Sequence, residues 1–249
     1  MIATVVAADP TNVFQWLADS SERLGSGPIP AQAWITIWHS LAATTIAIVL
    51  AVPLAAWLAH NRKAELLSAW IVNIGRVIPT VTIVAVAVLV SLRNGFGFEP
   101  WPILIALVAM ALPPIFSNTY TAVRAVDENV VSAARAIGTT ERSILTSIEL
   151  PLASVVILTG IRVAAVQVVA TEVIGAFFGG EGLGAYIRQG LGNRDDLEVQ
   201  AGALLIISVA MTLDLCLFLA SKALIPKGVG AVKRDRPSFH SPPSTSIPQ

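Results

Sequence analysis

The chain has 249 residues, of which 55% are hydrophobic and 13% charged, and its formal net charge is zero. An average soluble domain carries roughly 25% charged residues, so this composition excludes an ordinary soluble protein and indicates a membrane protein with several spans. The balanced charge leaves no basic face for nucleic acid, and the single cysteine, Cys216, excludes a disulfide within the chain.

Five apolar runs are long enough to cross a hydrocarbon core of about 30 Å, which takes about 20 helical residues. Residues 1–31 are expected to form an extracytoplasmic lead-in, exposed over residues 9–30, in which Phe14, Trp16 and Leu17 can rest at the membrane interface. Residues 226–249 form a tail that is predicted to be disordered. Between them lies one transmembrane domain, 32–225, with spans predicted at 34–59, 66–92, 101–123, 152–178 and 199–224.

The basic residues of the loops predict the orientation, because Lys and Arg in short loops stay on the cytoplasmic side. Ten of them lie on the side of the C-terminus and four on the side of the N-terminus. We therefore expect the N-terminus outside and the C-terminus inside. Residues 1–8 lack the basic start and the apolar length of a cleavable signal peptide.

The most polar segment between two runs, 127–150, is predicted to be a helix–bend–helix elbow in the cytoplasm. Asp127 can cap its first helix. Val130, Ala134 and Ile137 recur at helical spacing and form one apolar stripe. Such a stripe suits a groove on a partner protein. It equally suits the surface of the lipid bilayer, and periodicity alone leaves both interpretations open.

The second half of the elbow begins with residues that interrupt and restart a helix. Gly138 allows a sharp bend, and Thr139 or Thr140 can cap a second short helix. Pro151 follows where the next membrane helix would begin, a position that tolerates a missing N–H. The elbow is thus expected to join the fourth span directly.

The spacing of residues in this elbow resembles the EAA loop of permease subunits of binding-protein-dependent ABC importers. Ser132 stands where that family usually has an acidic residue, and Glu128 or Glu141 can offer a carboxylate nearby. The resemblance implies the all-α membrane fold of type I ABC importer permeases (MetI-like), with the elbow as the helix that couples to the ATPase. The residues assigned to this coupling are Ser132, Ala133, Ala134, Ile137, Gly138, Ile148, Leu150 and Pro151.

Four further stretches are similar to permeases of glycine betaine, carnitine and choline importers: 78–80, 118–121, 160–167 and 179–184. The likeness implies an osmoprotectant importer in the inner membrane of a bacterium. A permease for methionine or another amino acid is the nearest rival within the family. An ion-coupled secondary transporter is the rival from another class, and we find no inverted repeat to support it.

The resemblance also implies the partners. The chain contains no Walker-type sequence, so we expect no catalytic and no metal site in it, and ATP with Mg in the partner ATPase. One chain of five spans supplies half a pathway. The expected assembly holds a second permease chain, identical or paralogous, two ABC ATPase subunits, an extracytoplasmic solute-binding protein and membrane lipid.

Charges at bilayer depth are costly, so they mark either a solute path or structural pairs. Glu172, with Gln167 and Pro79, is a candidate for the path, where a carboxylate favours a quaternary ammonium cation; a structural role for Glu172 is equally open. For three other charged residues the structural interpretation is favoured: Arg76, Arg162 and Asp214.

The glycine-rich stretch 179–184 is predicted to be a flexible turn on the outer face. No strand precedes it, so it is not a dinucleotide-binding motif. The residues assigned to contact with the solute-binding protein are Gly180, Glu181, Gly182 and Gly184.

Overall fold

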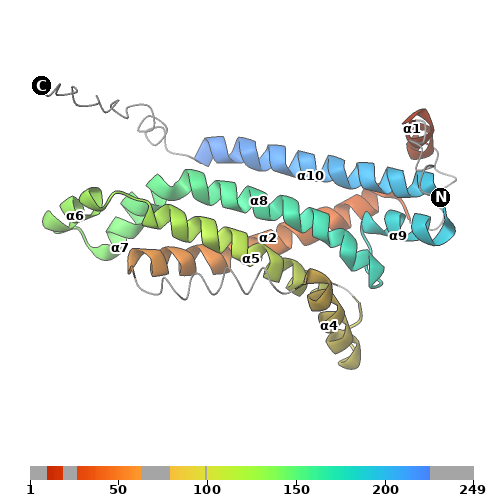
Figure 1. Ribbon diagram of the computed structural model, residues 1–249, viewed down its shortest axis with the longest axis horizontal. Coiled ribbons are helices and arrows are strands. Elements are labelled where there is room, and N and C mark those ends of the chain that lie inside the picture. Colours follow the sequence, from red (N-terminus) through yellow and green to blue (C-terminus); the bar gives the residue numbers. More distant parts are fainter. Residues whose placement is uncertain (1–9, 19–26, 63–78, 99, 225–249) are drawn as a thin grey trace, which may run out of the picture.

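The computed structural model describes residues 10–18, 27–62, 79–98 and 100–224, and all regular secondary structure within these ranges is helical (Figure 1). The all-α prediction is therefore confirmed. The elements are α1 (Pro10–Ala18), α2 (Ile29–His60), α4 (Thr80–Arg93), α5 (Trp101–Arg124), α6 (Glu128–Ala136), α7 (Glu141–Ile144), the π-helical turn η2 (Leu145–Glu149), α8 (Leu150–Phe177), α9 (Gly184–Asn193) and α10 (Asp196–Leu224).

Four of the described helices are long and apolar enough to cross a membrane: α2, α5, the continuous helix Glu141–Phe177 and α10. They correspond to four of the predicted spans, although α2 already begins at Ile29. The remaining predicted span, 66–92, is described only from residue 79 onward. There it contains α4, a helix of 14 residues.

The core lies where α2, α5 and α8 pack side by side (Figure 1). On α2, alanines at every fourth position face this core: Ala43, Ala47, Ala51 and Ala55 are at most 2% exposed. Small side chains let the backbones of membrane helices approach closely. Such close van der Waals packing stabilises helix association in lipid, where burial of apolar side chains contributes little free energy. Gly160 of α8 serves the same purpose, since a Cβ there would lie 2.5 Å from the Asn118 Cβ on α5.

The bundle has two distinct ends. We call the end with α6 and α7 the elbow end, and the opposite end, where α1 and α9 lie beside α10, the α9 end (Figure 1). At the α9 end Trp16 is 3% exposed and meets the Tyr186 ring edge-on at 5.9 Å. Trp16 therefore packs against the bundle, because α1 buries one face there. Its place at the membrane interface stays a prediction. Phe14, on the other face of α1, is 66% exposed.

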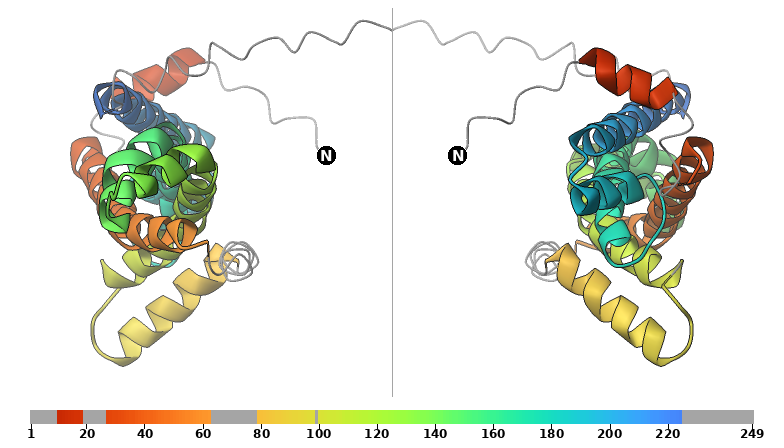
Figure 2. Two further views of the ribbon diagram at one scale, coloured as in Figure 1. Left: turned by 90° about the vertical axis from the view of Figure 1, so that its left-hand side faces the viewer. Right: turned by 90° about the vertical axis from the view of Figure 1, so that its right-hand side faces the viewer.

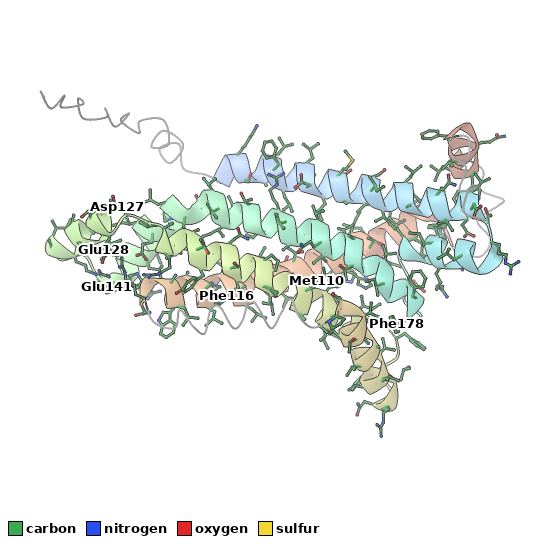
Figure 3. The ribbon with its side chains drawn as sticks, viewed as in Figure 1. Met110, Phe116, Asp127, Glu128, Glu141 and Phe178 are labelled. Atoms are coloured by element: carbon green, nitrogen blue, oxygen red, sulfur yellow. The ribbon has the colours of Figure 1, made fainter. Side chains whose placement is uncertain are left out.

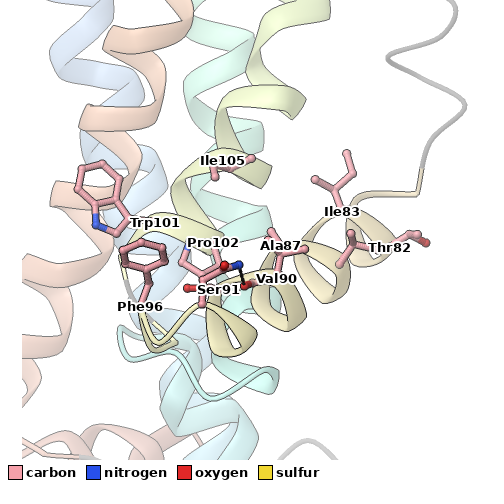
Figure 4. A pocket seen from close by; sticks show the side chains of 11 residues that line it. Thr82, Ile83, Ala87, Val90, Ser91, Phe96, Trp101, Pro102 and Ile105 are labelled. Atoms are coloured by element: carbon pink, nitrogen blue, oxygen red, sulfur yellow. Dashed lines mark hydrogen bonds between the residues drawn. The ribbon is translucent and has the colours of Figure 1, made fainter.

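Helix α4 diverges from the bundle (Figure 2). Its residues and the start of α5 line an open groove. The groove has a volume of about 810 Å³ and is lined mainly by apolar side chains, among them Ile83, Val86, Val90, Trp101 and Ile105 (Figure 4).

Candidate functional site: the elbow and the opposite turn

The elbow has the predicted helix–bend–helix form. The Asp127 carboxylate accepts a hydrogen bond from the Asn129 amide at 2.9 Å and caps α6, and the Thr140 hydroxyl accepts from the Ser143 amide at 3.4 Å and caps α7. Between the helices Gly138 has φ +85°, in the left-handed region that favours glycine. Apart from its chain neighbours, no atom of the described residues lies within 4 Å of where its Cβ would stand, so only the backbone requires a glycine there.

The apolar face of the elbow differs from the prediction. Val131 and Ala134 are buried against Ile144, whereas Val130 is 44% and Ile137 84% exposed. The expected stripe of Val130, Ala134 and Ile137 is therefore wrong as one surface. Ala134 lies on the buried face of α6, close to the border with its exposed face, and Ile137 follows the last residue of that helix. The outer face of the elbow thus carries exposed apolar side chains.

The residues assigned to coupling fall into two groups. The first group is exposed and open to a partner: Ser132, Ala133, Ile137 and Gly138. The second group holds the elbow on the bundle. Ile148 packs on the Val131 cluster, and Leu150 packs on the core of α2, α5 and α8, with Ala134 buried and Pro151 half-buried beside them.

Polar contacts join the elbow to the last turn of α2. The His60 Nδ1 lies 2.6 Å from the Glu149 Oε2, and its Nε2 lies 3.0 Å from the Glu141 Oε2. Arg62, just after α2, donates to Glu128 at 2.7 Å. Glu128 and Glu141 lie together at the elbow end (Figure 3). The spacing of charges in the sequence did not reveal His60 or Glu149, because the two lie 89 positions apart and pair only through the fold.

The carboxylates of Glu128 and Glu141, which the sequence offered as replacements for an acidic residue at 132, are engaged within the chain. Arg135 donates two hydrogen bonds to Glu141, at 2.8 and 3.0 Å. These hydrogen bonds lower the pKa of the Glu141 carboxyl below its ordinary value, so Glu141 stays ionised beside His60. Both carboxylates are more than half exposed, and a partner can still reach them.

A π-helical turn, η2, connects α7 to α8 without a break. Its hydrogen bond runs from the Leu150 amide to the Leu145 carbonyl, and Glu149 in it is 5% exposed. Pro151 follows in the first turn of α8, as predicted, although the helix already begins at Glu141. The backbone is therefore helical without a break from Glu141 to Phe177, so the elbow and α8 form one continuous element.

Arg162 of α8 and Asp214 of α10 form a pair with two hydrogen bonds, at 2.9 and 2.8 Å. The structural interpretation of these two charges is confirmed, since each offsets the cost of the other within the membrane. Phe218 adds to the site, because the Arg162 guanidinium lies 4.8 Å from its ring centre. Arg76 lies outside the described residues.

The three candidates for the solute path are not brought together. Glu172 is 1% exposed and accepts a hydrogen bond from the Thr36 hydroxyl at 3.0 Å. Gln167 lies on the exposed surface of α8, and Pro79 caps the start of α4. The contact with α2 favours the structural role for Glu172, and the path assignment of the three stays a prediction.

The glycine-rich turn is tied to the start of α2. The Gly182 amide donates to the Gln32 Oε1 at 2.6 Å, and the Leu183 amide donates to the Thr36 Oγ1 at 2.9 Å. Gly180, Gly182 and Gly184 are buried, so of the four residues assigned to the binding protein only Glu181 is exposed. Gly182 and Gly184 provide room for this close packing, because a Cβ on either would lie within 3 Å of a neighbouring atom. The flexibility expected of the turn stays a prediction.

Among the described residues, no three His, Cys, Asp or Glu side chains gather as a metal site. The geometry is that of an elbow continuous with one membrane helix and fastened to another.

Comparison with known proteins places this geometry in a family. Residues 43–228 match the family model described as the binding-protein-dependent transport system inner membrane component. The choline transport system permease protein OpuBB of Bacillus subtilis is 32% identical over 211 residues, which are 85% of this chain and 95% of that protein. The carnitine transport permease protein OpuCB of Listeria monocytogenes is 31% identical over 80% of this chain and 88% of its own length.

A third relative, the osmoprotectant import permease protein OsmW of Salmonella typhimurium, is 30% identical over 78% of this chain and 90% of its own length. Among solved structures, an inward-facing MetNI methionine ABC transporter chain matches with a TM-score of 0.72. It covers 82% of this chain and 99% of that chain at 18% identity, a likeness of fold alone. The chain therefore belongs to the family of inner-membrane components of binding-protein-dependent transport systems.

Proposed function

We propose that this chain is the transmembrane permease of an ABC importer for a quaternary ammonium osmoprotectant such as choline, carnitine or glycine betaine. The observation that carries the proposal is the likeness to permeases named for these solutes, which extends over about four fifths of the chain. A secondary transporter has no need of an elbow built as this one is.

The elbow provides the mechanical part of the proposal. An importer must turn the closure of two cytoplasmic ATPase subunits into movement of membrane helices. The exposed residues Ala133, Ile137 and Gly138 present a small, apolar surface to the ATPase. The continuous helix Glu141–Phe177 then carries the displacement into the bundle, and the contacts of His60 and Arg62 carry it into α2. ATP and Mg stay in the partner.

The assembly follows from the same role. Two permease chains, two ATPase subunits and an extracytoplasmic solute-binding protein complete it, in the inner membrane of a bacterium, with the N-terminus outside and the C-terminus inside. The basic residues around the elbow and after α10 support this orientation. In the most apolar 18-residue stretch of α10, only 6% of the residues are buried against the described part of the chain. The other residues can contact lipid or the second permease.

The amino-acid alternative has weaker support. It is supported only by the fold shared with the methionine transporter, and at 18% identity a shared fold does not indicate a shared solute.

Uptake by the complete assembly in liposomes tests the proposal. The assembly is supplied with ATP inside and loaded binding protein outside, and is offered labelled choline, carnitine, glycine betaine and methionine in turn. We expect ATP-dependent uptake of at least one quaternary ammonium solute. Uptake of methionine alone supports the amino-acid alternative, and uptake driven by an ion gradient without ATP contradicts the proposal altogether. A non-hydrolysable ATP analogue is the control.

A further inference from the structure

The polar contacts at the α9 end form one connected set. The Thr36 hydroxyl donates to the Glu172 Oε2 at 3.0 Å and accepts from the Leu183 amide at 2.9 Å, so both of its hydrogen-bonding functions are used. One turn earlier on α2, Gln32 accepts from the Gly182 amide. We call this set, with His39, the α9-end clamp.

Burial makes the geometry of the clamp strict. Thr36 is fully buried, Glu172 is 1% exposed and His39 is 2% exposed, with its Nδ1 3.5 Å from the Glu172 Oε1. A buried polar group without a partner costs about 1–3 kcal/mol, so Thr36, Glu172 and the Leu183 amide depend on one another. The His39 Nδ1 and the Glu172 Oε1 approach each other without a hydrogen bond among the described residues. Because the Thr36 proton points to Glu172, its lone pairs face the Leu183 amide. Glu172 thus orients the hydroxyl that holds the turn.

Gly182 shows how closely the parts approach. A Cβ on this residue would run into the Glu172 Oε1 and would lie 2.8 Å from the Thr36 Oγ1. Its φ of +95° also lies in the left-handed region. The backbone of the turn at Gly182 therefore packs directly against the Glu172 carboxyl, and position 182 leaves no room for a side chain.

The same two helices are joined again at the elbow end. There His60 of α2 contacts Glu149, the residue directly before α8. Twenty-four positions separate Thr36 from His60, which corresponds to about 36 Å along a helix. Between these two joints the alanines of α2 pack in the core with α8. Helices α2 and α8 are thus fastened together at both ends.

We propose that Thr36 and Glu172 are positioning residues that lock the turn 179–184 to α2, so that α2 and α8 move as one unit between the α9 end and the elbow. On the proposed function, on which this inference rests, docking of the loaded binding protein at the turn is passed to the ATPase through this pair of helices. Glu172 then acts by holding the turn.

The first test measures the clamp without any transport. Thr36→Val keeps the shape of the side chain and removes both hydrogen bonds, and Thr45→Val, at an exposed site on the same helix, is the matched control. Hydrogen exchange of the Gly182–Leu183 segment is measured in the complete assembly. We expect exchange about fivefold faster in Thr36→Val, as loss of one hydrogen bond predicts, and unchanged exchange in Thr45→Val. Unchanged exchange in Thr36→Val overturns the clamp.

The second test measures coupling. ATP hydrolysis by the assembly in nanodiscs is followed as loaded binding protein is added. In Thr36→Val we expect the half-maximal concentration of binding protein to rise about fivefold, while the rate at saturation changes less than about twofold. Glu172→Gln, which keeps an acceptor for Thr36, should lie close to the native protein, and Glu172→Leu should resemble Thr36→Val.

The outcomes separate the two proposals. Faster exchange of the turn with an unchanged half-maximal concentration overturns the inference. An equal loss of rate at all concentrations of binding protein does so as well, since it indicates a merely structural role. If the native assembly shows no stimulation by its binding protein, the proposed function fails and the coupling role fails with it, and the exchange measurement still decides whether the clamp holds the turn.

Discussion

At the elbow end, α2 is fastened mostly by ion pairs whose side chains reach the surface, whereas at the α9 end it is fastened by buried hydrogen bonds to a close-packed turn. Arg62 and Glu128 are 43% and 63% exposed, and Thr36 and Glu172 are at most 1% exposed. Exposed ion pairs contribute little stability and are easily broken and re-formed in water. The difference suits an elbow that shifts with an ATPase and a turn that keeps its shape.

Gly182→Ala is expected to have the largest effect, because it attacks the close packing of the α9 end. The added Cβ meets Glu172 and Thr36, and the backbone lies in the left-handed region. We expect a loss of about 2–4 kcal/mol in the free energy of unfolding. Thermal unfolding in detergent measures it.

Gly192→Ala is the control, since in the described part of the chain no residue beyond its neighbours and its own helix backbone comes within 4 Å of its Cβ position, and its φ is not in the left-handed region. It should be neutral or slightly stabilising, as alanine favours a helix over glycine. Equal melting temperatures for the two variants would contradict the described packing of the turn.

His60→Ala comes next, because its contact with Glu149 is the buried part of the elbow end. Both side chains are 7% exposed, and the variant leaves the Glu149 carboxylate without this partner. We expect a loss of about 1–3 kcal/mol. Equilibrium unfolding of the native chain, His60→Ala, Glu149→Gln and the double variant measures it. Strictly additive effects would show that the two side chains do not interact.

Gly138→Glu tests the surface of the elbow. The side chain would stand in open space with φ +85°, so the variant should insert normally and lose contact with the ATPase. We expect uptake to fall at least about tenfold, equivalent to about 1.4 kcal/mol, while ATP hydrolysis becomes uncoupled from transport. Gly95→Glu, which has φ +77° and equally open space after α4, is the matched control. Normal uptake by Gly138→Glu would contradict the role of the elbow as a lever.

Arg62→Ala should have the smallest effect. Its pair with Glu128 is exposed, and such pairs contribute at most about 1 kcal/mol. We expect a change in unfolding free energy below about 0.5 kcal/mol, reduced further in high salt. A loss as large as that of His60→Ala would show that this exposed pair holds α2 as firmly as the buried contact at the same end.

The sequence predicted well what depends on local chemistry. Asp127 and Thr140 cap the elbow helices as their side chains suggest. The apolar runs are helical wherever the structure describes them, because a helix satisfies all backbone groups of a spanning segment within the segment itself. The elbow was found from its polarity and from family spacing.

What depends on distant partners could not be predicted. His60 is one isolated histidine in the sequence, and its contacts with Glu141 and Glu149 exist only after α2 folds against α8. In the same way, the glycines at 182 and 184 could not be assigned to close packing until their neighbours on α2 and α8 were known. The face of α6 was misassigned because a nine-residue helix offers too few positions to separate Val130 from Val131.

The central claim is that the exposed face of the elbow contacts the ATPase, and crosslinking tests it most directly. A photoreactive amino acid is placed at Ile137, which is 84% exposed, in the complete assembly in native membranes, with Gly95 as the control position. The account predicts a crosslink from position 137 to the ABC ATPase subunit and none from position 95. Crosslinks from position 137 to phospholipid alone would contradict it.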